Sequence, residues 1–251
     1  MPSSTSVTLD VVLLLPWNVR EQAISSSRAL AARMASNGFP SHFRLGEPYD
    51  ASASASASAS ADGGCEPHVS LFMLAVAPSE VPDVVEAVHG VATASPPLHA
   101  VGNEYRHNPH GAPEMYFARS AAWVSLQRSV IEEVEPLRRG RLRKVGPSGE
   151  RLHDVMTCRP PANPVAAAQL ARYGYDEVAD GDGDRFNPHV TLAWPDDPNS
   201  RVSLTDLPPA QVYSCVLSEI AVYGMSPYGT CTTGHATFPL CAQRASTFTG
   251  S

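Results

Sequence analysis

The chain has 251 residues, of which 43% are hydrophobic and 17% are charged, and its net charge is −7. An acidic protein of this kind is a poor candidate for holding long nucleic acid through its phosphates, so we expect no DNA partner. No apolar stretch approaches the roughly 20 residues of a membrane span, so we also expect no membrane partner.

The five cysteines follow neither zinc-knuckle nor CxxC spacing, which is typical of reduced thiols in an intracellular protein. Asp10 interrupts the apolar run near the start of the sequence, so this run is a poor signal peptide. The expected compartment is the cytoplasm, with the nucleus as the alternative. Lys144 is the single lysine among 18 basic residues, so a cation that holds a phosphate here would be an arginine.

Apolar residues recur with period two or with helical spacing along most of the chain. The period-two runs and their β-branched content predict strands at residues 7–15, 41–45, 68–76, 98–105, 115–118, 189–194, 216–223 and 235–240. The helical spacing predicts helices at residues 19–36, 81–95, 121–134 and 165–173. Pro136 is expected to end the third helix, and Asn163 followed by Pro164 is expected to begin the fourth.

Residues 51–61 are a strict Ala-Ser alternation in which no side chain is large enough to anchor a core. This composition predicts a disordered insertion at about 47–66. The other elements alternate between strand and helix in two similar halves, and no glycine-rich phosphate loop follows a strand. The order favours an α+β protein with an internal duplication over a doubly wound parallel sheet.

One tetrapeptide pattern occurs twice, as HVSL at residues 68–71 and as HVTL at residues 189–192. Side chains in a strand alternate between its two faces. His68 and Ser70 therefore share one face of the first strand, and His189 and Thr191 share one face of the second. If the two strands lie side by side, two imidazoles and two hydroxyls converge in one groove.

This pair of motifs resembles the H-x-[ST]-h signature of the 2H phosphoesterase superfamily, which includes the RNA 2′,3′-cyclic phosphodiesterases, also called 2′-5′ RNA ligases. The opening strand, which ends Leu13-Leu14-Leu15-Pro16, and the segments 217–223 and 236–240 are similar to further strands of that family. The resemblance therefore covers most of the chain from residue 7 to residue 240.

The resemblance implies a bilobal α+β fold with pseudo-twofold symmetry. Two antiparallel-sheet lobes with outer helices would face each other across a central groove, and residues 1–251 would form this single domain. The Ala-Ser insertion and the segment 136–164 are longer than a minimal member of the family needs. They leave the loops that line the substrate unassigned.

Two histidines that flank one phosphorus can open a cyclic phosphodiester without a metal or a cofactor. The unperturbed pKa of histidine is near ~6.5, so one ring can accept a proton from water while the other protonates the leaving ribose oxygen. Repulsion between two close imidazoles separates their titrations. By analogy with the family, we expect His68 to be the acid and His189 the base. Ser70 and Thr191 would donate to the non-bridging phosphate oxygens.

Three further residues are predicted to bind the substrate. Phe72 has the strand parity of the first motif, so we expect its ring beside that histidine, where a base could stack on it. Arg119 and Tyr223 are expected on the wall of the groove. Trp194 has the opposite parity to the second histidine and is expected in the core.

Two other patterns have a plain interpretation and a functional alternative. His107 and His110 have H-x-x-H spacing, but the turn between them and the absence of a nearby cysteine or carboxylate favour a surface loop over a metal site. The basic run 138–144 follows a helix, where positive charge is favourable, and an RNA-contacting loop is the alternative.

The sequence therefore predicts a monomeric, metal-independent phosphodiesterase with no cofactor. Its partner would be a 2′,3′-cyclic phosphate, or a related 2′-5′ or 3′ phosphodiester, of a nucleotide or an RNA end, and hydrolysis and ligation both stay open. One alternative is a non-catalytic nucleotide- or RNA-binding module that keeps the groove. Another is a structural protein in which the motifs coincide by chance. Two complete histidine–hydroxyl pairs favour the enzyme.

Overall fold

The computed structural model describes residues 6–49, 63–146, 150–158, 161, 163–181 and 183–241, and the Ala-Ser alternation at 51–61 lies outside them. The strands are β1 (Val7–Leu14), β2 (His68–Val76), β3 (Leu98–Ala100), β4 (Gly102–His107), β5 (Pro113–Phe117), β6 (His189–Thr191), β7 (Cys215–Leu217), β8 (Glu219–Ser226) and β9 (Thr230–Pro239). The helices are α1 (Trp17–Ser36), α2 (Val81–Ala94), α3 (Ala121–Arg138), α4 (Leu152–Cys158) and α5 (Pro164–Tyr173), with short 3₁₀ turns η2 (Pro78–Glu80), η3 (Ala210–Tyr213) and η4 (Pro227–Gly229). Within the described part of the chain, no helix combines the length and hydropathy needed to cross a bilayer.

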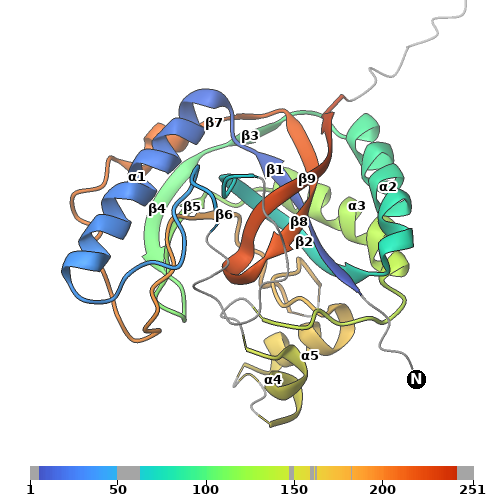
Figure 1. Cartoon of the computed structure of the whole chain (residues 1–251). Helices are drawn as coiled ribbons and strands as arrows, with labels where there is room; N and C mark the ends of the chain where they lie inside the picture. Colours follow the sequence, from blue (N-terminus) through green and yellow to red (C-terminus); the bar gives the residue numbers. More distant parts are fainter. Residues whose placement is uncertain are drawn as a thin grey trace, which may run out of the picture.

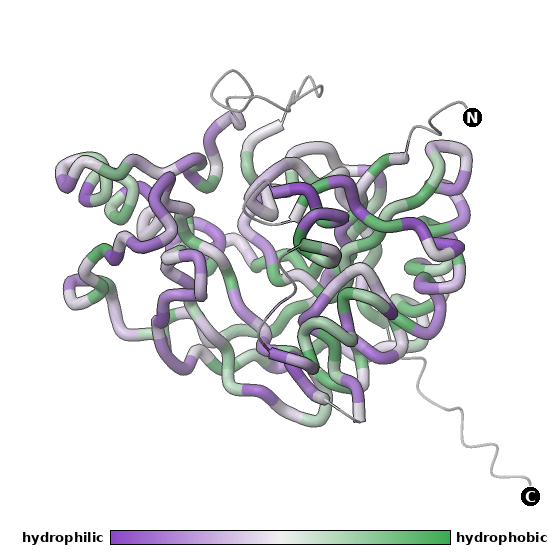
Figure 2. Tube along the Cα trace, turned by 90° about the horizontal axis from the view of Figure 1, so that it is seen from below, coloured by the Kyte–Doolittle hydropathy of each residue, from purple (hydrophilic) through white to green (hydrophobic). Residues whose placement is uncertain are grey.

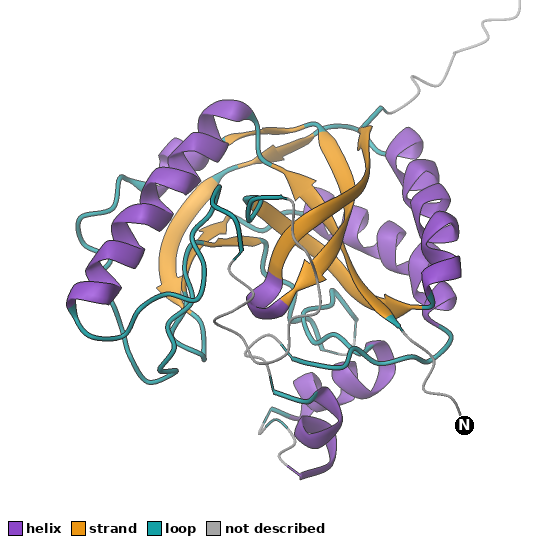
Figure 3. Ribbon diagram, in the orientation of Figure 1, coloured by secondary structure: helices purple, strands orange, loops and turns teal. Residues whose placement is uncertain are grey.

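The strands form antiparallel sheets at the centre of the molecule, with the longer helices outside them (Figure 1, Figure 3). One sheet has the strand order β2-β1-β8-β9, and the others have the orders β3-β7 and β4-β5-β6. Only Val101 separates β3 from β4, so the chain joins these last two sheets into one lobe. Both motif strands, β2 and β6, are edge strands, and they contact each other. The α+β fold with antiparallel sheets is therefore confirmed.

Each lobe is covered by helices, and the two lobes share one hydrophobic core. Helix α2 contacts β8 and β9, and α3 contacts β2. Helix α1 lies on the other lobe (Figure 1), where the Tyr213 hydroxyl donates to Ser26 Oγ at 3.0 Å. Val69 of the first motif and Val190 of the second belong to the same buried cluster. Figure 2 shows hydrophobic segments, in green, alternating with hydrophilic ones along the trace. The shared core fixes the two motif strands relative to each other.

A β-bulge in β2 reverses the strand parity just after the first motif. Val12 of β1 lies opposite Ser70, but its neighbour Val11 lies opposite Phe72. Leu71 is therefore the extra residue of the bulge, with no partner of its own on β1. One extra residue shifts every later side chain of the strand to the opposite face.

The bulge overturns the prediction that Phe72 lines the groove. The Phe72 side chain is fully buried and packs edge-on against Tyr175, with ring centroids 5.9 Å apart. Met73 lies on the groove side instead, where Phe72 would lie if the strand had no bulge. The aromatic ring therefore stabilises the core beneath the site.

We expect Phe72→Ala to lower the free energy of unfolding by about 3–5 kcal/mol, because it removes a fully buried ring and leaves a cavity. Trp17→Ala is the control, since this aromatic side chain is 73% exposed and its loss should change stability by less than about 0.5 kcal/mol. Urea denaturation of the three proteins measures both effects. A Phe72 variant as stable as the wild type would contradict the buried position of the ring.

Three further predictions about the elements are wrong. The segment 41–45 makes isolated bridges from Ser41 and Leu45 to two different segments, and without one continuous partner it forms no strand. Helix α3 continues through Pro136 to its last turn, where the carbonyl that proline leaves unbonded can face solvent. Strand β6 is shorter than predicted and ends at Thr191. In addition, the structure contains helix α4, which the periodicity does not mark.

Candidate active site

The two motifs meet at a cavity of about 130 Å³ between the edge strands β2 and β6. His68 and Ser70 line it from β2, and His189 and Thr191 line it from β6. The other lining residues are Met73, Asn108, Pro109, His110, Glu114, Tyr175, Asp176, Glu177, Arg185, Trp194, Tyr228 and Gly229. The structure thus brings together all four residues of the predicted catalytic and phosphate-binding set.

The backbone holds both imidazoles in the same tautomer. His68 Nδ1 lies 2.6 Å from the carbonyl oxygen of Glu66, and His189 Nδ1 lies 2.7 Å from that of Asn187. A carbonyl oxygen only accepts hydrogen bonds, so Nδ1 carries the proton and donates it in each case. Nε2 is then the nitrogen that can exchange a proton with a substrate.

Each imidazole also has a carboxylate partner on the neighbouring strand. His68 Nε2 lies 3.8 Å from Asp10 Oδ2, and Asp10 belongs to β1, which pairs with β2. His189 Nε2 lies 3.6 Å from Glu114 Oε1, and Glu114 belongs to β5, which pairs with β6. The pseudo-twofold relation between the lobes therefore extends to the chemistry of the site.

Both motif hydroxyls donate to these same carboxylates. Ser70 Oγ donates to Asp10 Oδ2 at 2.7 Å, and Thr191 Oγ1 donates to Glu114 Oε1 at 3.4 Å. A hydroxyl has one proton to donate. Each would have to turn away from its carboxylate before it could donate to a phosphate oxygen, as the sequence predicted for this pair.

The surroundings shift the pKa values of the two histidines in opposite directions. Burial lowers the pKa of His189, but the carboxylates of Glu114 and Glu177 outweigh it, and the net pKa is raised. Burial lowers the pKa of His68, and the carbonyl and carboxylate of Glu66 only partly oppose it. These directions favour His189 as the proton donor and His68 as the proton acceptor, which is the reverse of the assignment expected from the family.

Two of the carboxyl groups at the cavity hold protons more tightly than usual. Burial raises the pKa of Asp10 to about 8, against the opposing effects of the Ser70 hydrogen bond and of Arg143. Burial likewise raises the pKa of Glu177 to about 7. The side chain of Glu177 is 37% exposed, so solvent screens it more than it screens the fully buried Asp10. Near neutral pH the cavity therefore carries less negative charge than its carboxyl groups would suggest.

Arg185 is the arginine that lines the cavity. Its Nε donates to the carbonyl oxygen of Asp176 at 2.7 Å, and its Nη2 lies 3.3 Å from an Asp176 carboxylate oxygen. The guanidinium is thus held in place at the rim, where it can attract an anion.

Part of the basic run 138–144 turns inward, while Arg139 and Lys144 are exposed. Arg138 and Arg143 are buried, and Arg141 pairs with Glu80 at 2.6 Å. Arg143 Nη1 lies 3.3 Å from the sulfur of Met73, directly behind the cavity lining. These side chains join α3 to the sheet and to the wall of the site.

Arg119 and Tyr223 do not line the cavity. Arg119 lies beyond the end of β5, is exposed and pairs with Asp184. It borders a separate surface hollow of about 640 Å³ at the start of α3, whose lining contains no histidine or cysteine. Tyr223 lies opposite Asp10 on β8, and β1 stands between β8 and the motif strand β2. Neither side chain borders this cavity, because position along the chain was a poor guide to its wall, although the partner of Arg119, Asp184, lines the second hollow described below.

An aromatic wall that sequence reasoning did not foresee closes one side of the cavity. His110 stacks on Trp194 with ring centroids 5.6 Å apart, and Trp194 contacts the ring of Tyr228 at 5.9 Å. Trp194 is buried as expected, but it also lines the cavity. Strand β6 ends at Thr191, so the alternation of side chains between its two faces no longer determines where Trp194 points. The turn that carries His110 was expected to be a plain surface loop.

A second hollow of about 330 Å³ continues the site on the β6 side. It shares Glu114, Glu177, Arg185 and His189 with the cavity. Its further lining residues include Tyr116, Asn163, Asp184 and Asn187. The two hollows together leave room for a molecule longer than a single phosphate.

The two lobes are built on antiparallel sheets, and each brings one histidine–hydroxyl motif to the same cavity. This is the fold of the 2H phosphoesterases, as the resemblance of the motifs implied. The structure is similar to that of TT0787 from Thermus thermophilus, with a TM-score of 0.55 and 17% identity over 94% of this chain and 100% of that one. It is also similar to E. coli LigT crystallised with ATP, with a TM-score of 0.50 and 15% identity over 95% of this chain and 99% of that one. These likenesses confirm the fold. The sequence matches no family model and no curated protein.

Proposed function

We propose that the chain is a 2H-type phosphodiesterase that opens a 2′,3′-cyclic phosphate, or cleaves a related 2′-5′ or 3′ phosphodiester, of a nucleotide or an RNA end. The observation that carries the proposal is the meeting of His68 and His189 at one cavity. Each ring has its Nδ1 bound to the backbone and its Nε2 left for proton exchange. Two oriented imidazoles at one site suit acid–base catalysis without a metal.

In the proposed reaction the neutral His68 removes a proton from water, and the water oxygen attacks the phosphorus. The bond from phosphorus to one ribose oxygen breaks, and protonated His189 gives its proton to that oxygen. The raised pKa of His189 supports its place as the acid. The products are a linear phosphate monoester and a free ribose hydroxyl.

The phosphate would be held by Arg185 and by the hydroxyls of Ser70 and Thr191 after they turn from their carboxylates. Asp10, with its pKa raised to about 8, is mostly protonated at neutral pH and then repels an anion little. Donors around the phosphorus would stabilise the charge that develops on its oxygens. The cavity is lined from elements of one chain, so a monomer is sufficient for the reaction.

The remainder of a nucleotide would occupy the second hollow or lie against the aromatic wall of His110 and Trp194. Nucleobases stack on such rings with little preference among bases. LigT, which has the same fold, was crystallised with ATP, and this supports a nucleotide as the class of ligand. The proposed partner is therefore a small nucleotide or an RNA end.

The test is incubation of the full chain, in the presence of a chelator, with 2′,3′-cyclic mononucleotides of all four bases and with 2′-5′- and 3′-5′-linked dinucleotides. Chromatography against 2′- and 3′-monophosphate standards identifies the products, with heat-denatured protein as the control. We expect a linear monophosphate from at least one cyclic nucleotide. Tight binding of these nucleotides without turnover would replace the enzyme by the non-catalytic binding module.

A further inference from the structure

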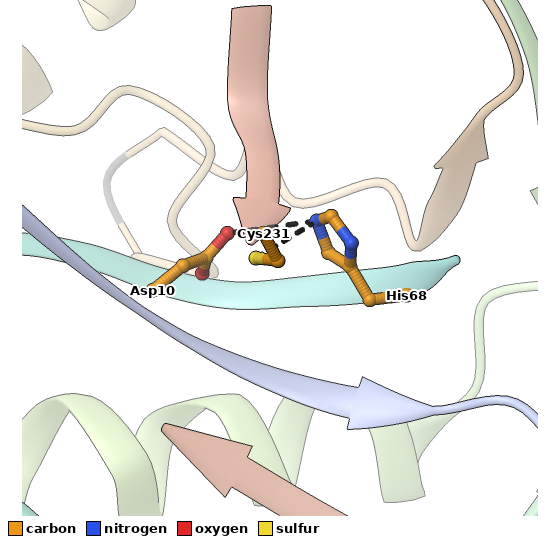
Figure 4. Close-up of side chains that lie close together, drawn as sticks. All are labelled: Asp10, His68 and Cys231. Carbon is orange, nitrogen blue, oxygen red and sulfur yellow. Dashed lines mark hydrogen bonds and ion pairs between the residues drawn. The ribbon is translucent and has the colours of Figure 1, made fainter. Parts of the chain in front are cut away.

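Three potential metal ligands from three different strands point toward one another beside the cavity. Asp10 comes from β1, His68 from β2 and Cys231 from β9 (Figure 4). His68 Nε2 lies 3.6 Å from Cys231 Sγ and 3.8 Å from Asp10 Oδ2, and one ligand atom of each residue lies within 4.8 Å of the others. The reaction proposed above makes no use of Cys231.

The spacing of these atoms matches the edge of a tetrahedral metal site. Zinc bonds of about 2.3 Å to sulfur and about 2.0 Å to nitrogen, at a tetrahedral angle, separate the two ligand atoms by about 3.5 Å. The measured distance between Cys231 Sγ and His68 Nε2 is 3.6 Å. The carboxylate of Asp10 would have to approach the imidazole by a few tenths of an ångström. Its oxygen would also have to lie about 3.6 Å from Cys231 Sγ, and the ligand atoms of the cluster now lie within 4.8 Å of one another.

The surroundings of the cluster also point to a cation. His68 Nδ1 donates to the carbonyl of Glu66, which directs the lone pair of neutral Nε2 toward the cluster and is the usual outer contact of a metal-bound histidine. Asp10 is fully buried, its Oδ2 accepts from Ser70, and its Oδ1 has no hydrogen-bond partner among the residues that the structure describes. A buried acceptor without a donor is costly, and a cation between the carboxylate and the imidazole would satisfy both.

We propose that Asp10, His68 and Cys231 form a binding site for a divalent transition metal such as Zn²⁺, and that the bound metal inhibits the enzyme. The inhibitory part rests on the proposed function, because that function makes His68 a catalytic residue. A thiolate, an imidazole and a carboxylate together select zinc-like ions, since Mg²⁺ and Ca²⁺ take oxygen ligands. On binding, the thiol of Cys231 and the carboxyl group of Asp10, where it is protonated, each release a proton to solvent.

Inhibition follows from the shared nitrogen. The lone pair on His68 Nε2 that would accept a proton from water is the same lone pair that would bind the metal. The ion can enter through the cavity, because His68 lines it, whereas Asp10 and Cys231 are fully buried. A fourth ligand, water, would complete the tetrahedron.

Cobalt(II) provides a readout that does not depend on activity. The full chain, freed of metal by chelator and dialysis, is titrated with Co²⁺ while the absorption spectrum is recorded. We expect one equivalent to give a thiolate-to-cobalt charge-transfer band and the intense visible bands of a tetrahedral ion, both abolished by Zn²⁺. Cys231→Ala should lose the charge-transfer band, and Asp10→Asn, which keeps the side-chain shape, should weaken binding tenfold or more.

Matched controls remove three of the other four thiols. Cys65→Ala deletes a buried thiol outside the cluster, and Cys158→Ser with Cys241→Ser deletes two exposed ones. These variants should keep the charge-transfer band. No band in the wild type, or a band that survives Cys231→Ala, would overturn the site. Either result leaves the proposed function intact, because turnover is measured in chelator.

The inhibitory part is tested by adding Zn²⁺ to the turnover assay and comparing each protein with its own rate in chelator. We expect the wild type to lose at least nine-tenths of its rate at Zn²⁺ concentrations that fill the site, and to regain it in chelator. Cys231→Ala should need at least tenfold more Zn²⁺ for the same loss. Equal sensitivity of the two proteins would overturn inhibition through this cluster. If the wild type shows no turnover in chelator, the proposed function fails while the cobalt spectra still decide the metal site.

Discussion

His68→Ala and His189→Ala should each lower kcat for hydrolysis of a 2′,3′-cyclic nucleotide by about 10²–10⁴-fold, because each substitution removes one of the two proton-transfer groups. The phosphate would still be bound by Arg185 and by the motif hydroxyls, so KM should change much less than kcat. Steady-state kinetics in chelator, with circular dichroism to confirm the fold, measures the effect. His99→Ala is the matched control, since His99 is an exposed strand histidine that does not line the cavity.

The double variant His68→Ala/His189→Ala should lose less than the product of the two single losses, because the two rings act in one concerted proton exchange and either loss disables it. Full additivity would indicate that the rings act in separate steps. A single variant that keeps near wild-type kcat would remove that histidine from the proposed mechanism. Each ring lies at the first residue of its strand, so its removal should leave the fold intact. A loss of activity with an unchanged circular dichroism spectrum is then attributable to the loss of proton transfer.

The predicted parts of the fold depend on long, uniform patterns. The apolar run around the first motif forms strand β2 as predicted, the run around the second forms β6 over fewer residues than predicted, and Asn163 caps α5 by accepting from the backbone N–H groups of Val165 and Ala166. The meeting of His68 and His189 follows from the contact between the edge strands β2 and β6, which the repeated motif suggested by placing the two strands side by side. These features are predictable because, for each of them, the local sequence pattern and the tertiary packing favour the same structure.

The failures come from features that a periodic pattern does not record. A single extra residue in β2 sends Phe72 into the core, and its position depends on the pairing with β1. Arg119 was expected on the wall of the groove, but the arginine that lines the cavity is Arg185. Arg185 reaches the cavity from an irregular segment that periodicity leaves unassigned, where its place is set by contacts with Asp176.

The carboxylate partners of the histidines differ in how visible they are in the sequence. Asp10 is an acidic residue inside an apolar strand, and a charged residue at a core position is a signal of function that was available from the sequence. Glu114 offers no such signal, because it stands at the start of a short strand beside a turn. Its role becomes apparent only when β5 pairs with β6 and places its carboxylate beside His189.

The rate of the proposed reaction should fall at high pH, where His189 loses the proton that it must donate. The pKa of His189 is raised, since Glu114 and Glu177 outweigh the effect of burial, with a smaller contribution from Asp10. The acid is therefore present below this raised pKa and is lost as the pH rises through it. Above that point log kcat should fall with a slope of one, a tenfold loss for each pH unit. A pH–rate profile recorded in chelator measures this limb.

Glu114→Gln should move the descending limb of the pH–rate profile to lower pH. The substitution keeps the shape of the side chain and an oxygen that can accept from Thr191 or Asn108, but it removes the negative charge 3.6 Å from His189 Nε2. Without that charge the imidazolium is less stable and its pKa falls. A purely structural role for Glu114 would lower the rate at every pH and leave the limb where it is.

The matched control is Glu104→Gln, an exposed carboxylate on the adjacent strand β4, which should leave both limbs of the profile unmoved. If Glu114→Gln instead moves the ascending limb to lower pH and leaves the descending limb in place, His189 acts as the base, since a lower pKa extends the range of its working, neutral form. No movement of either limb would show that neither belongs to His189. The limb that moves therefore assigns the proton donor, which the symmetry of the two motifs leaves undetermined.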